Sequence, residues 1–477
     1  MQYVFSRWTA LPLLLGGLVI TAACIEDSDD ADDEADGEIR VVHAISDVSA
    51  VDILLDGEPI QPFTGIAYGD SSELIGVDAG EVDLTVVPSG SGLDEALDLE
   101  DLDGAIEIAE DERHVVILSH RREAGPQAQV RTETIPEESG QDTGTVFFQV
   151  AHYSPIAPEE LDFYLIEDGD ELDGNTEPVA TVNYDGLGEG EWSEVQEFEK
   201  GDFDLIVTES GADPTDADEQ LFRHDLDQSE ASLLEGEVIF FAAMDSRRAS
   251  SPIDVTLVRE AAGSPYLGML DERAGLRILH GVLDHDDPGE DGSIDIDLDD
   301  QSELVTDLSP EDTSATQAIE HGERELTARY SSSQGDILTD EELEIQESED
   351  VFAIVAGRAS SDTFELIRRG MPFSPMNSED GRFLFTHAAP DYPGELEVAF
   401  ADDDEPLGEE LEVGEGPIFN LPAEEFELEV RDEQEELVAE MDLAIEAGIL
   451  YNITAVDNED GEIELIVDEL PVNPPLD

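Results

Sequence analysis

The sequence has few basic residues. Only 20 Lys and Arg stand against 123 Asp and Glu, which gives a formal net charge of -103. A protein that binds nucleic acid needs a basic stripe or patch that neutralises phosphates and releases their counterions. Like charges also repel across the whole surface. Nucleic acid and anionic membrane surfaces are therefore excluded as electrostatic partners.

Residue types and motifs that carry chemistry are also scarce. The chain has one cysteine and two tryptophans, and a single cysteine cannot form an intramolecular disulfide. Few aromatic residues leave few of the platforms on which sugar rings stack in carbohydrate clefts. No nucleophile elbow, H-E-x-x-H helix, C-x-x-C pair, P-loop or G-x-G-x-x-G turn occurs. We therefore expect a protein that is not an enzyme and that needs no cofactor.

Hydrophobic residues still make up 40% of the chain, so it does not resemble a disordered acidic segment. The positive charge is almost entirely arginine, with Lys200 the single lysine. This balance is typical of proteins from salt-loving organisms. Dense carboxylates stay hydrated in molar salt, where a Debye length of about 3 Å screens their repulsion. We expect adaptation to high salt; an ordinary acidic surface protein is the alternative.

The N-terminal segment indicates where in the cell the protein is located. Residues 1–23 read as a leader, in which Arg7 precedes an apolar run from Leu11 to Ala23. The run ends in TAAC, which resembles the lipobox of bacterial lipoproteins. That resemblance implies that Cys24 is acylated and anchors the chain to a membrane outside the cytoplasm, in the cell envelope or at the cell surface. A secreted protein with a cleaved leader and an uncleaved anchor are the alternatives, although the run is short for a spanning helix.

Residues 24–37 are almost all acidic or small. Such a segment has nothing to bury and repels itself, so it predicts a disordered tether that holds the first domain away from the membrane. Loose binding of Ca²⁺ is the alternative interpretation.

Four similar segments follow with a period of roughly 110 residues, which is typical of a string of domains. Each opens with an apolar run that ends in histidine. A strand of alternating pattern, a middle strand after Gly or Ala and a closing hairpin-like pair come next. The predicted fold is therefore all-β, with four tandem antiparallel β-sandwiches. Their bounds are 38–136, 145–260, 275–370 and 381–471, and the third diverges most. Residues 92–110 and 212–235 fit either a short helix or a loop crossover.

The first repeat reads RVVHAISDVSAVDILLDG, then IAYGDSS, then VDAGEVDLTVVPSG. This pattern resembles the domain of unknown function 4397 (DUF4397) family, whose motif is close to RVVHASPDAPAVDVYVDG followed by a YG pair and a VTVTPAG-like strand. The resemblance extends in weaker form from Glu38 to Leu470. It implies immunoglobulin-like sandwiches in extracytoplasmic proteins, and it carries no catalytic or binding residues to transfer.

The best candidate residues by position are the four histidines that end the opening strands: His43, His152, His280 and His387. A metal or catalytic site needs ligands that converge, whereas these residues occupy one equivalent position in four domains. We interpret them as structural, with a ligand or pH-sensing role as the alternative.

One acidic loop in the third repeat is a candidate calcium site. Its potential oxygen ligands are Asp284, Asp286, Asp287 and Asp291, with glycines nearby for tight turning. The spacing does not match a calcium loop, so surface charge is the competing interpretation.

These observations favour a non-catalytic lipoprotein that displays β-sandwich modules for binding or adhesion to another surface protein or a polymer. A structural envelope spacer without a specific ligand is an alternative. A hydrolase with an uncharacterised site at a domain junction is another.

Overall fold

The computed structural model describes residues 37–471, with gaps at 47, 49, 61–62, 94–95, 100–104, 111, 120–124, 133–143, 168–171, 185–191, 200, 218, 227–237, 247, 260–265, 284–291, 300, 333–334, 362, 374–379, 393, 402–405 and 459. The expected leader, the lipidation candidate Cys24 and the expected tether up to residue 36 lie outside the described residues.

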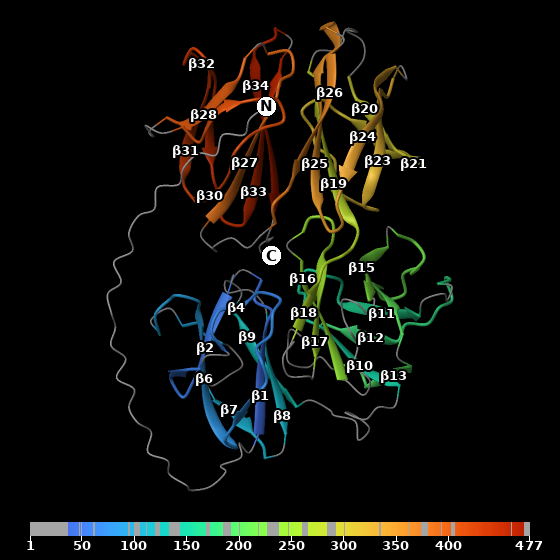
Figure 1. Ribbon diagram of the computed structural model, residues 1–477, viewed down its shortest axis with the longest axis vertical. Helices are drawn as coiled ribbons and strands as arrows, with labels where there is room; N and C mark the ends of the chain where they lie inside the picture. Colours follow the sequence, from blue (N-terminus) through green and yellow to red (C-terminus); the bar gives the residue numbers. More distant parts are fainter. Residues whose placement is uncertain are drawn as a thin grey trace, which may run out of the picture.

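Four β-sandwiches follow one another along the chain, which confirms the predicted all-β tandem architecture (Figure 1). Each sandwich has one sheet that contains the opening strand of the repeat, here called the inner sheet, and a second, outer sheet. The described residues contain no α-helix. No helix among them is long and apolar enough to cross a membrane.

Repeats 1 and 2 share one strand order. The inner sheet of repeat 1 runs β5 (Ile75–Val77), β1 (Gly37–His43), β8 (Arg113–Ser119), β9 (Gln127–Thr132), and its outer sheet runs β3 (Glu58–Pro59), β2 (Ala50–Leu55), β6 (Gly80–Pro88), β7 (Ala105–Ile108), with β4 (Ile66–Ala67) also on β2. The inner sheet of repeat 2 runs β13 (Gln196–Glu199), β10 (Thr145–His152), β16 (Val238–Asp245), β17 (Ile253–Arg259), β18 (Tyr266–Met269), and its outer sheet runs β12 (Ala180–Asn183), β11 (Glu160–Glu167), β14 (Phe203–Glu209), β15 (Gln220–Leu226).

Repeats 3 and 4 repeat that order. The inner sheet of repeat 3 runs β22 (Gln317–Ile319), β19 (Ala274–Gly281), β25 (Asp350–Arg358), β26 (Thr363–Gly370), and its outer sheet runs β21 (Gln301–Leu308), β20 (Ile294–Leu298), β23 (Gly322–Tyr330), β24 (Asp336–Ile345); the short 3₁₀ helix η4 (Ala359–Ser361) links β25 to β26. The inner sheet of repeat 4 runs β30 (Ile418–Pro422), β27 (Asp380–Ala388), β33 (Ile449–Asp457), β34 (Ile463–Pro471), and its outer sheet runs β29 (Gly408–Leu411), β28 (Leu396–Phe400), β31 (Glu425–Asp432), β32 (Leu437–Ala444).

The pairing differs from the expectation of purely antiparallel sheets in one respect. In every repeat the opening strand pairs in parallel with the first strand of the closing hairpin, as β1 does with β8, β10 with β16, β19 with β25 and β27 with β33. Parallel neighbours need a long crossover, and here the chain supplies it by building the outer sheet in between. The two undecided segments contribute strands to that crossover, β7 on β6 and β15 on β14.

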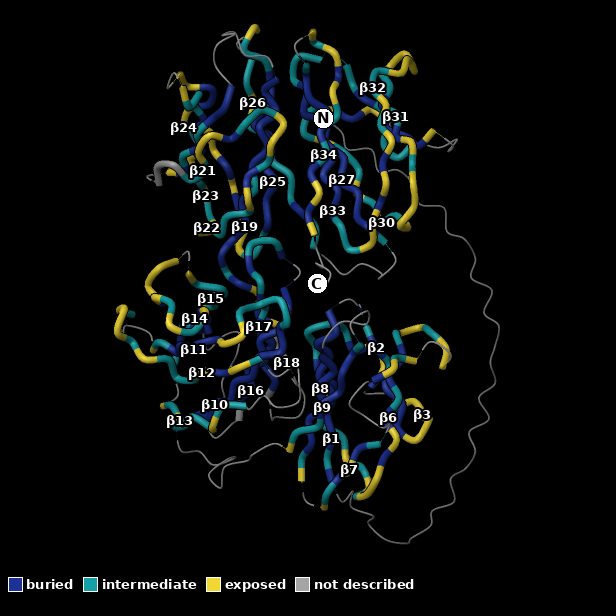
Figure 2. The backbone as a smooth tube through the Cα atoms, turned by 180° about the vertical axis from the view of Figure 1, so that it is seen from behind, coloured by how far each residue is buried: buried dark blue, intermediate teal, exposed yellow. Residues whose placement is uncertain are grey.

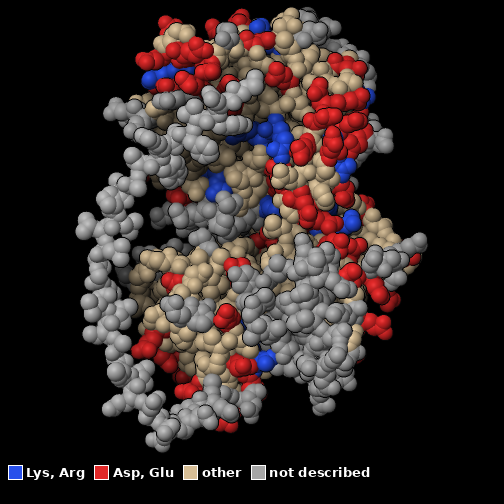
Figure 3. Space-filling model, in the orientation of Figure 1, with Lys and Arg blue, Asp and Glu red and all other residues tan. Residues whose placement is uncertain are grey.

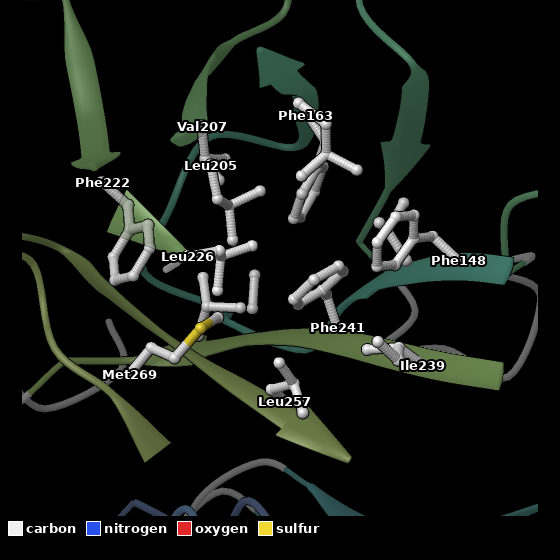
Figure 4. Packing of buried hydrophobic residues seen from close by; sticks show 14 of the residues in the cluster. Phe148, Phe163, Leu205, Val207, Phe222, Leu226, Ile239, Phe241, Leu257 and Met269 are labelled. Carbon is white, nitrogen blue, oxygen red and sulfur yellow. The ribbon is translucent and has the colours of Figure 1, made fainter. Parts of the chain in front are cut away.

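Each sandwich encloses its own core. In repeat 2, four phenylalanines from both sheets are distributed across the core, and Met269 of β18 lies at one side of it, near Phe222 (Figure 4). These phenylalanines are Phe148, Phe163, Phe222 and Phe241, each at most 1% exposed. β18 lies between the expected bounds of repeats 2 and 3, and Met269, which is 1% exposed, joins it to the core of repeat 2.

The inner sheets are buried on both faces, as the dark central strands of Figure 2 show. In β25, Val351, Ala353 and Val355 point into the core of repeat 3. The alternate residues Phe352 and Ile354 instead pack against repeat 4. Strands covered on both sides read as continuous apolar runs rather than alternating ones. This explains why the opening strands and the first strands of the closing hairpins lack the alternation of the outer-sheet strands.

The repeats therefore associate in two pairs, 1 with 2 and 3 with 4, through what we call seams (Figures 1 and 2). The seam of pair 1–2 is an apolar cluster that includes Val42, Ile117, Tyr153, Phe240 and Met244. The seam of pair 3–4 includes Leu279, Phe352, Leu384, Leu450 and Val456. Burial of such side chains contributes about 1.5–3 kcal/mol each, so the seams hold each pair as one body.

A buried ion pair connects the two pairs. The Arg248 guanidinium of repeat 2 lies 3.1 Å from Asp350 Oδ1 of repeat 3, and the two side chains are 6% and 0% exposed. Arg248 also donates to the carbonyls of Asp271 and Arg273 at 2.6 and 2.7 Å. The backbone of Gly275 lies so close to the Asp350 side chain that a Cβ atom on Gly275 would lie 2.2 Å from Asp350 Oδ1. Glycine is required there for space.

We predict that Arg248→Ala destabilises the protein by about 3–5 kcal/mol, because it leaves the Asp350 carboxylate buried without its ion-pair partner. Denaturant unfolding checks this. The matched control is Arg324→Ala, which breaks an ion pair whose side chains are 23% and 36% exposed; its cost should stay below about 1 kcal/mol. Equal costs for the two variants would contradict the importance of this junction.

Candidate functional site

The four signature histidines share one geometry. His43 lies at the end of β1, where its Nε2 donates to Val48 O at 3.0 Å and its Nδ1 accepts from Ile45 N at 3.3 Å. The other three accept from the backbone N–H two residues further on at the same 3.3 Å distance. Nε2 of His152 and of His280 donates to Pro158 O and Gly292 O, and His387 makes a backbone hydrogen bond with Gly394. Each imidazole thus ties the loop that leads to the outer sheet.

The histidines are 0–1% exposed. Burial lowers the pKa of His152 from 6.5 to about 4, although the hydrogen bond to Pro158 acts in the opposite direction. Burial also lowers the pKa of His387 to about 4, against the hydrogen bond with Gly394. Both rings are therefore neutral near pH 7, with both nitrogens engaged by the backbone.

A repeated serine accompanies the histidine in the first three repeats, which sequence reasoning missed. Ser72, Ser193 and Ser314 each accept a hydrogen bond at Oγ from the opening strand, from Val41, Val150 and Ile278, at 2.9–3.0 Å. By strand register the fourth repeat has Gly416 there. The signal was present in the sequence as DSS, EWS and DTS before the edge strand of the inner sheet.

The expected calcium ligands Asp284, Asp286, Asp287 and Asp291 lie outside the described residues. Among the residues that the structure does describe, no three His, Cys, Asp or Glu side chains converge to hold a metal ion.

Carboxylates crowd the surface of repeats 3 and 4, as the red patches of Figure 3 show. A cleft of about 380 Å³ in repeat 4 is lined by Glu395, Leu396, Glu397, Glu410, Asp432, Glu433 and Glu435. Desolvation, together with the charges of Glu410 and Glu433, raises the pKa of Glu395. Like charges held this closely repel, and salt screens that repulsion.

The seam of pair 3–4 contains a buried polar cluster. Arg277 of β19 makes two hydrogen bonds to Asp468 of β34, at 2.9 and 2.5 Å, and Thr313 and Asn452 donate to the same carboxylate. Burial alone would raise the pKa of Asp468, but Arg277 outweighs it and lowers that pKa. Every oxygen of this carboxylate is used internally, which makes the cluster a structural element of the seam.

The seam of pair 1–2 instead opens into a groove of about 550 Å³. Repeat 1 contributes the end of β9, and repeat 2 contributes β10 and the segment that leads into β13. The lining residues are Arg131, Thr132, Gln149, Trp192, Ser193, Glu194 and Val195. This combination of one large aromatic side chain with convergent polar groups between two domains is typical of ligand sites.

Trp192 is fixed in this groove. Its indole stacks on Phe240 with ring centroids 4.1 Å apart and planes inclined by 19°. Its Nε1 donates to Tyr153 Oη at 2.6 Å. Sequence reasoning missed this residue because a low aromatic content argues against a platform on average, whereas a site needs only one well-placed ring.

We predict that the pH dependence of stability between about 6.5 and 4 originates partly in His152 and His387. Their folded-state pKa lies below the unfolded value, so the unfolded chain binds protons first as the pH falls. The stability that the neutral rings contribute is full above pH 6.5 and is lost toward pH 4. The double variant His152→Gln/His387→Gln should be less stable at pH 7 and show a flatter profile; denaturant unfolding at stepped pH measures both. Parallel profiles for the variant and the parent would contradict the prediction.

No curated protein matches the chain. Solved structures with some likeness include the Bacillus anthracis TIE protein, at 11% identity over 88% of this chain and 68% of that chain, with a TM-score of 0.16. A family CBM26 module of Eubacterium rectale Amy13K in complex with maltoheptaose shows 13% identity over 48% and 98%, TM-score 0.16. The tip fimbrial protein Mfa3 of Porphyromonas gingivalis shows 9% over 47% and 98%, TM-score 0.16. TM-scores this low support no conclusion about function.

A family model gives a firmer result. The model described as "Domain of unknown function (DUF4397)" matches residues 37–164, which span repeat 1 and the first two strands of repeat 2 almost to the end of β11. This match agrees with the resemblance carried by the RVVHAIS and VDILLDG strands. Residues 37–164 of this chain are therefore similar to the DUF4397 family.

Proposed function

We propose that this protein is a non-catalytic, lipid-anchored protein outside the cytoplasm that presents a rigid body of four β-sandwiches to a polymer or to another surface protein. The observation that carries the proposal is the burial of the inner sheets on both faces, which joins the repeats through extended apolar seams. In a flexible string of independent domains, few contacts connect one domain with the next.

The anchored end and the body have complementary roles in this proposal. An acylated Cys24 attaches the chain, and the acidic segment that follows holds the body at a distance from an anionic membrane through repulsion. The groove between repeats 1 and 2 then remains accessible to large partners. A pure spacer would need the rigid body but not the groove, so the groove favours binding over spacing.

High salt is the proposed working medium. The carboxylate cleft of repeat 4 concentrates like charge on one small surface. Arg248 and Arg277 form ion pairs between repeats, and the residues that line the cleft include no arginine. Salt screens the repulsion among these carboxylates.

We predict that the full chain expressed in a lipoprotein-processing bacterium incorporates labelled palmitate and sediments with membranes, and that Cys24→Ser loses both properties. Chemical labelling and membrane fractionation measure this. Ser28→Ala in the same acidic segment is the control and should behave as the parent does. Unchanged membrane association of Cys24→Ser would contradict the anchor.

We predict that the melting temperature rises steeply between low and molar NaCl. The double variant Glu395→Gln/Glu433→Gln should be more stable than the parent at low salt and less dependent on salt, because it removes two charges from the cleft. Glu58→Gln, at an exposed position in β3, is the control and should change little. Calorimetry across a salt series measures the effect, and a flat melting temperature for the parent would refute adaptation to salt.

A further inference from the structure

The two pairs of repeats allow the groove to be compared with its counterpart in the same molecule. In pair 1–2, Arg40 of the opening strand pairs with Val115, which pairs with Arg131 of β9. In pair 3–4, Arg277 at the same place before the histidine pairs with Phe352, which pairs with Arg369 of β26. Arg131 and Arg369 are therefore equivalent positions.

The opposite wall has an equivalent too. In repeat 2, Phe148 pairs with Gln196, four residues after Trp192. In repeat 4, Phe383 pairs with Phe419, four residues after Glu415. By this register, the place of Trp192 in pair 1–2 is that of Glu415 in pair 3–4.

In pair 3–4 the arginine position is in direct contact with the segment around Glu415. Arg369 donates to the carbonyls on either side of Glu415, to Gly414 O at 2.9 Å and Gly416 O at 2.8 Å. In pair 1–2 the equivalent arginine and the tryptophan both line the open groove of about 550 Å³. The equivalent positions thus lie in the seams of both pairs, and in pair 1–2 they line a groove with an aromatic wall.

The walls of the groove suit a sugar ring. An indole held by Phe240 and Tyr153 offers a preorganised apolar surface that loses little conformational freedom on binding. Gln149, Glu194 and Arg131 bring amide, carboxylate and guanidinium groups to the same space. An apolar platform bordered by planar hydrogen-bonding groups matches a pyranose, which has an apolar C–H face and a rim of hydroxyls.

Charge narrows the ligand class further. Glu194 stands in the groove itself, so it repels a bound carboxylate at contact distance, where the Debye length of about 3 Å in molar salt screens the repulsion only in part. The groove is open at the surface and lies between two repeats, so an internal part of a long polymer can enter it as well as an end can.

We propose that the groove between repeats 1 and 2 binds a neutral polysaccharide segment, with one pyranose ring on Trp192 and its hydroxyls on Gln149, Glu194 and Arg131. This assignment names the polymer partner that the proposed function leaves open. Its test uses purified protein in solution, so it can succeed or fail independently of the lipid anchor.

The sequence supplies a reporter for the experiment. Trp8 and Trp192 are the two tryptophans of the chain, and Trp8 lies in the expected leader. Once the leader is lost, or with Trp8→Phe where it is retained, tryptophan emission comes from the groove alone. This protein is titrated in 2 M NaCl with the neutral probes laminarihexaose, cellohexaose and mannohexaose, and with hyaluronan as an acidic probe. We expect a saturable change in Trp192 emission with at least one neutral probe and none with hyaluronan.

Variants then locate the binding. Trp192→Ala should lower the affinity for the responding probe, measured by calorimetry, at least about tenfold, as the truncation of hot-spot aromatic residues does. Trp192→Phe should retain part of the affinity. Glu415→Ala changes the equivalent position of pair 3–4 and should bind as the parent does.

Trp192 also packs on Phe240, so its replacement can affect the fold as well as the groove. Thr132→Tyr, at an exposed position on the rim, provides a second test. The larger side chain fills the groove from the opposite wall, so it should abolish binding and leave the melting temperature unchanged.

Three outcomes would overturn the proposal. The first is the absence of any response to the neutral probes. The second is a response to hyaluronan alone, which would assign the groove to a charged ligand. The third is binding that survives both Trp192→Ala and Thr132→Tyr, which would place the sugar elsewhere.

Discussion

The architecture depends on the double burial of the inner sheets. One face of each inner sheet closes its own sandwich, and the other face packs against the inner sheet of a neighbouring repeat. A large exposed apolar face is unfavourable in water, since each buried Å² of apolar surface contributes about 25 cal/mol. A single repeat that exposed its strand VFAIVAG to water would tend to aggregate. Pairing is therefore a condition of solubility as well as of stability.

Apolar seams alone do not define which way two similar domains meet. The described polar contacts at the seams and junction supply that definition, because a buried charge without its partner is costly. Arg277 with Asp468 sets pair 3–4, and Arg248 with Asp350 sets the junction between the pairs. In pair 1–2, Asp245 accepts hydrogen bonds from a serine of each repeat. The chain has only 20 Lys and Arg, and at least two of them, Arg248 and Arg277, fix the orientation of neighbouring repeats rather than neutralise surface charge.

The two pairs carry different side chains at equivalent places of their seams. Arg131 lines a groove with Trp192, and Arg369 donates to Gly414 O and Gly416 O of the neighbouring repeat, where Glu415 takes the place of Trp192. A loop residue of the seam thus differs between the pairs, whereas each repeat keeps its own apolar core. The DUF4397 match covers the part of the chain that contains β9 and β10 but ends before Trp192.

The strand content, the number of repeats and the histidine that ends each opening strand could be predicted from the sequence, because alternation and periodicity are local properties. The histidine geometry follows from contacts within a few residues, as His43 with Ile45 and Val48 shows. The parallel pairing of each opening strand with the first strand of the closing hairpin, the seams and the groove could not be predicted. They join residues such as Arg131 and Trp192, or Arg277 and Asp468, that lie far apart in the chain. An apolar run records that a strand is buried on both faces, but only the tertiary structure decides what covers it.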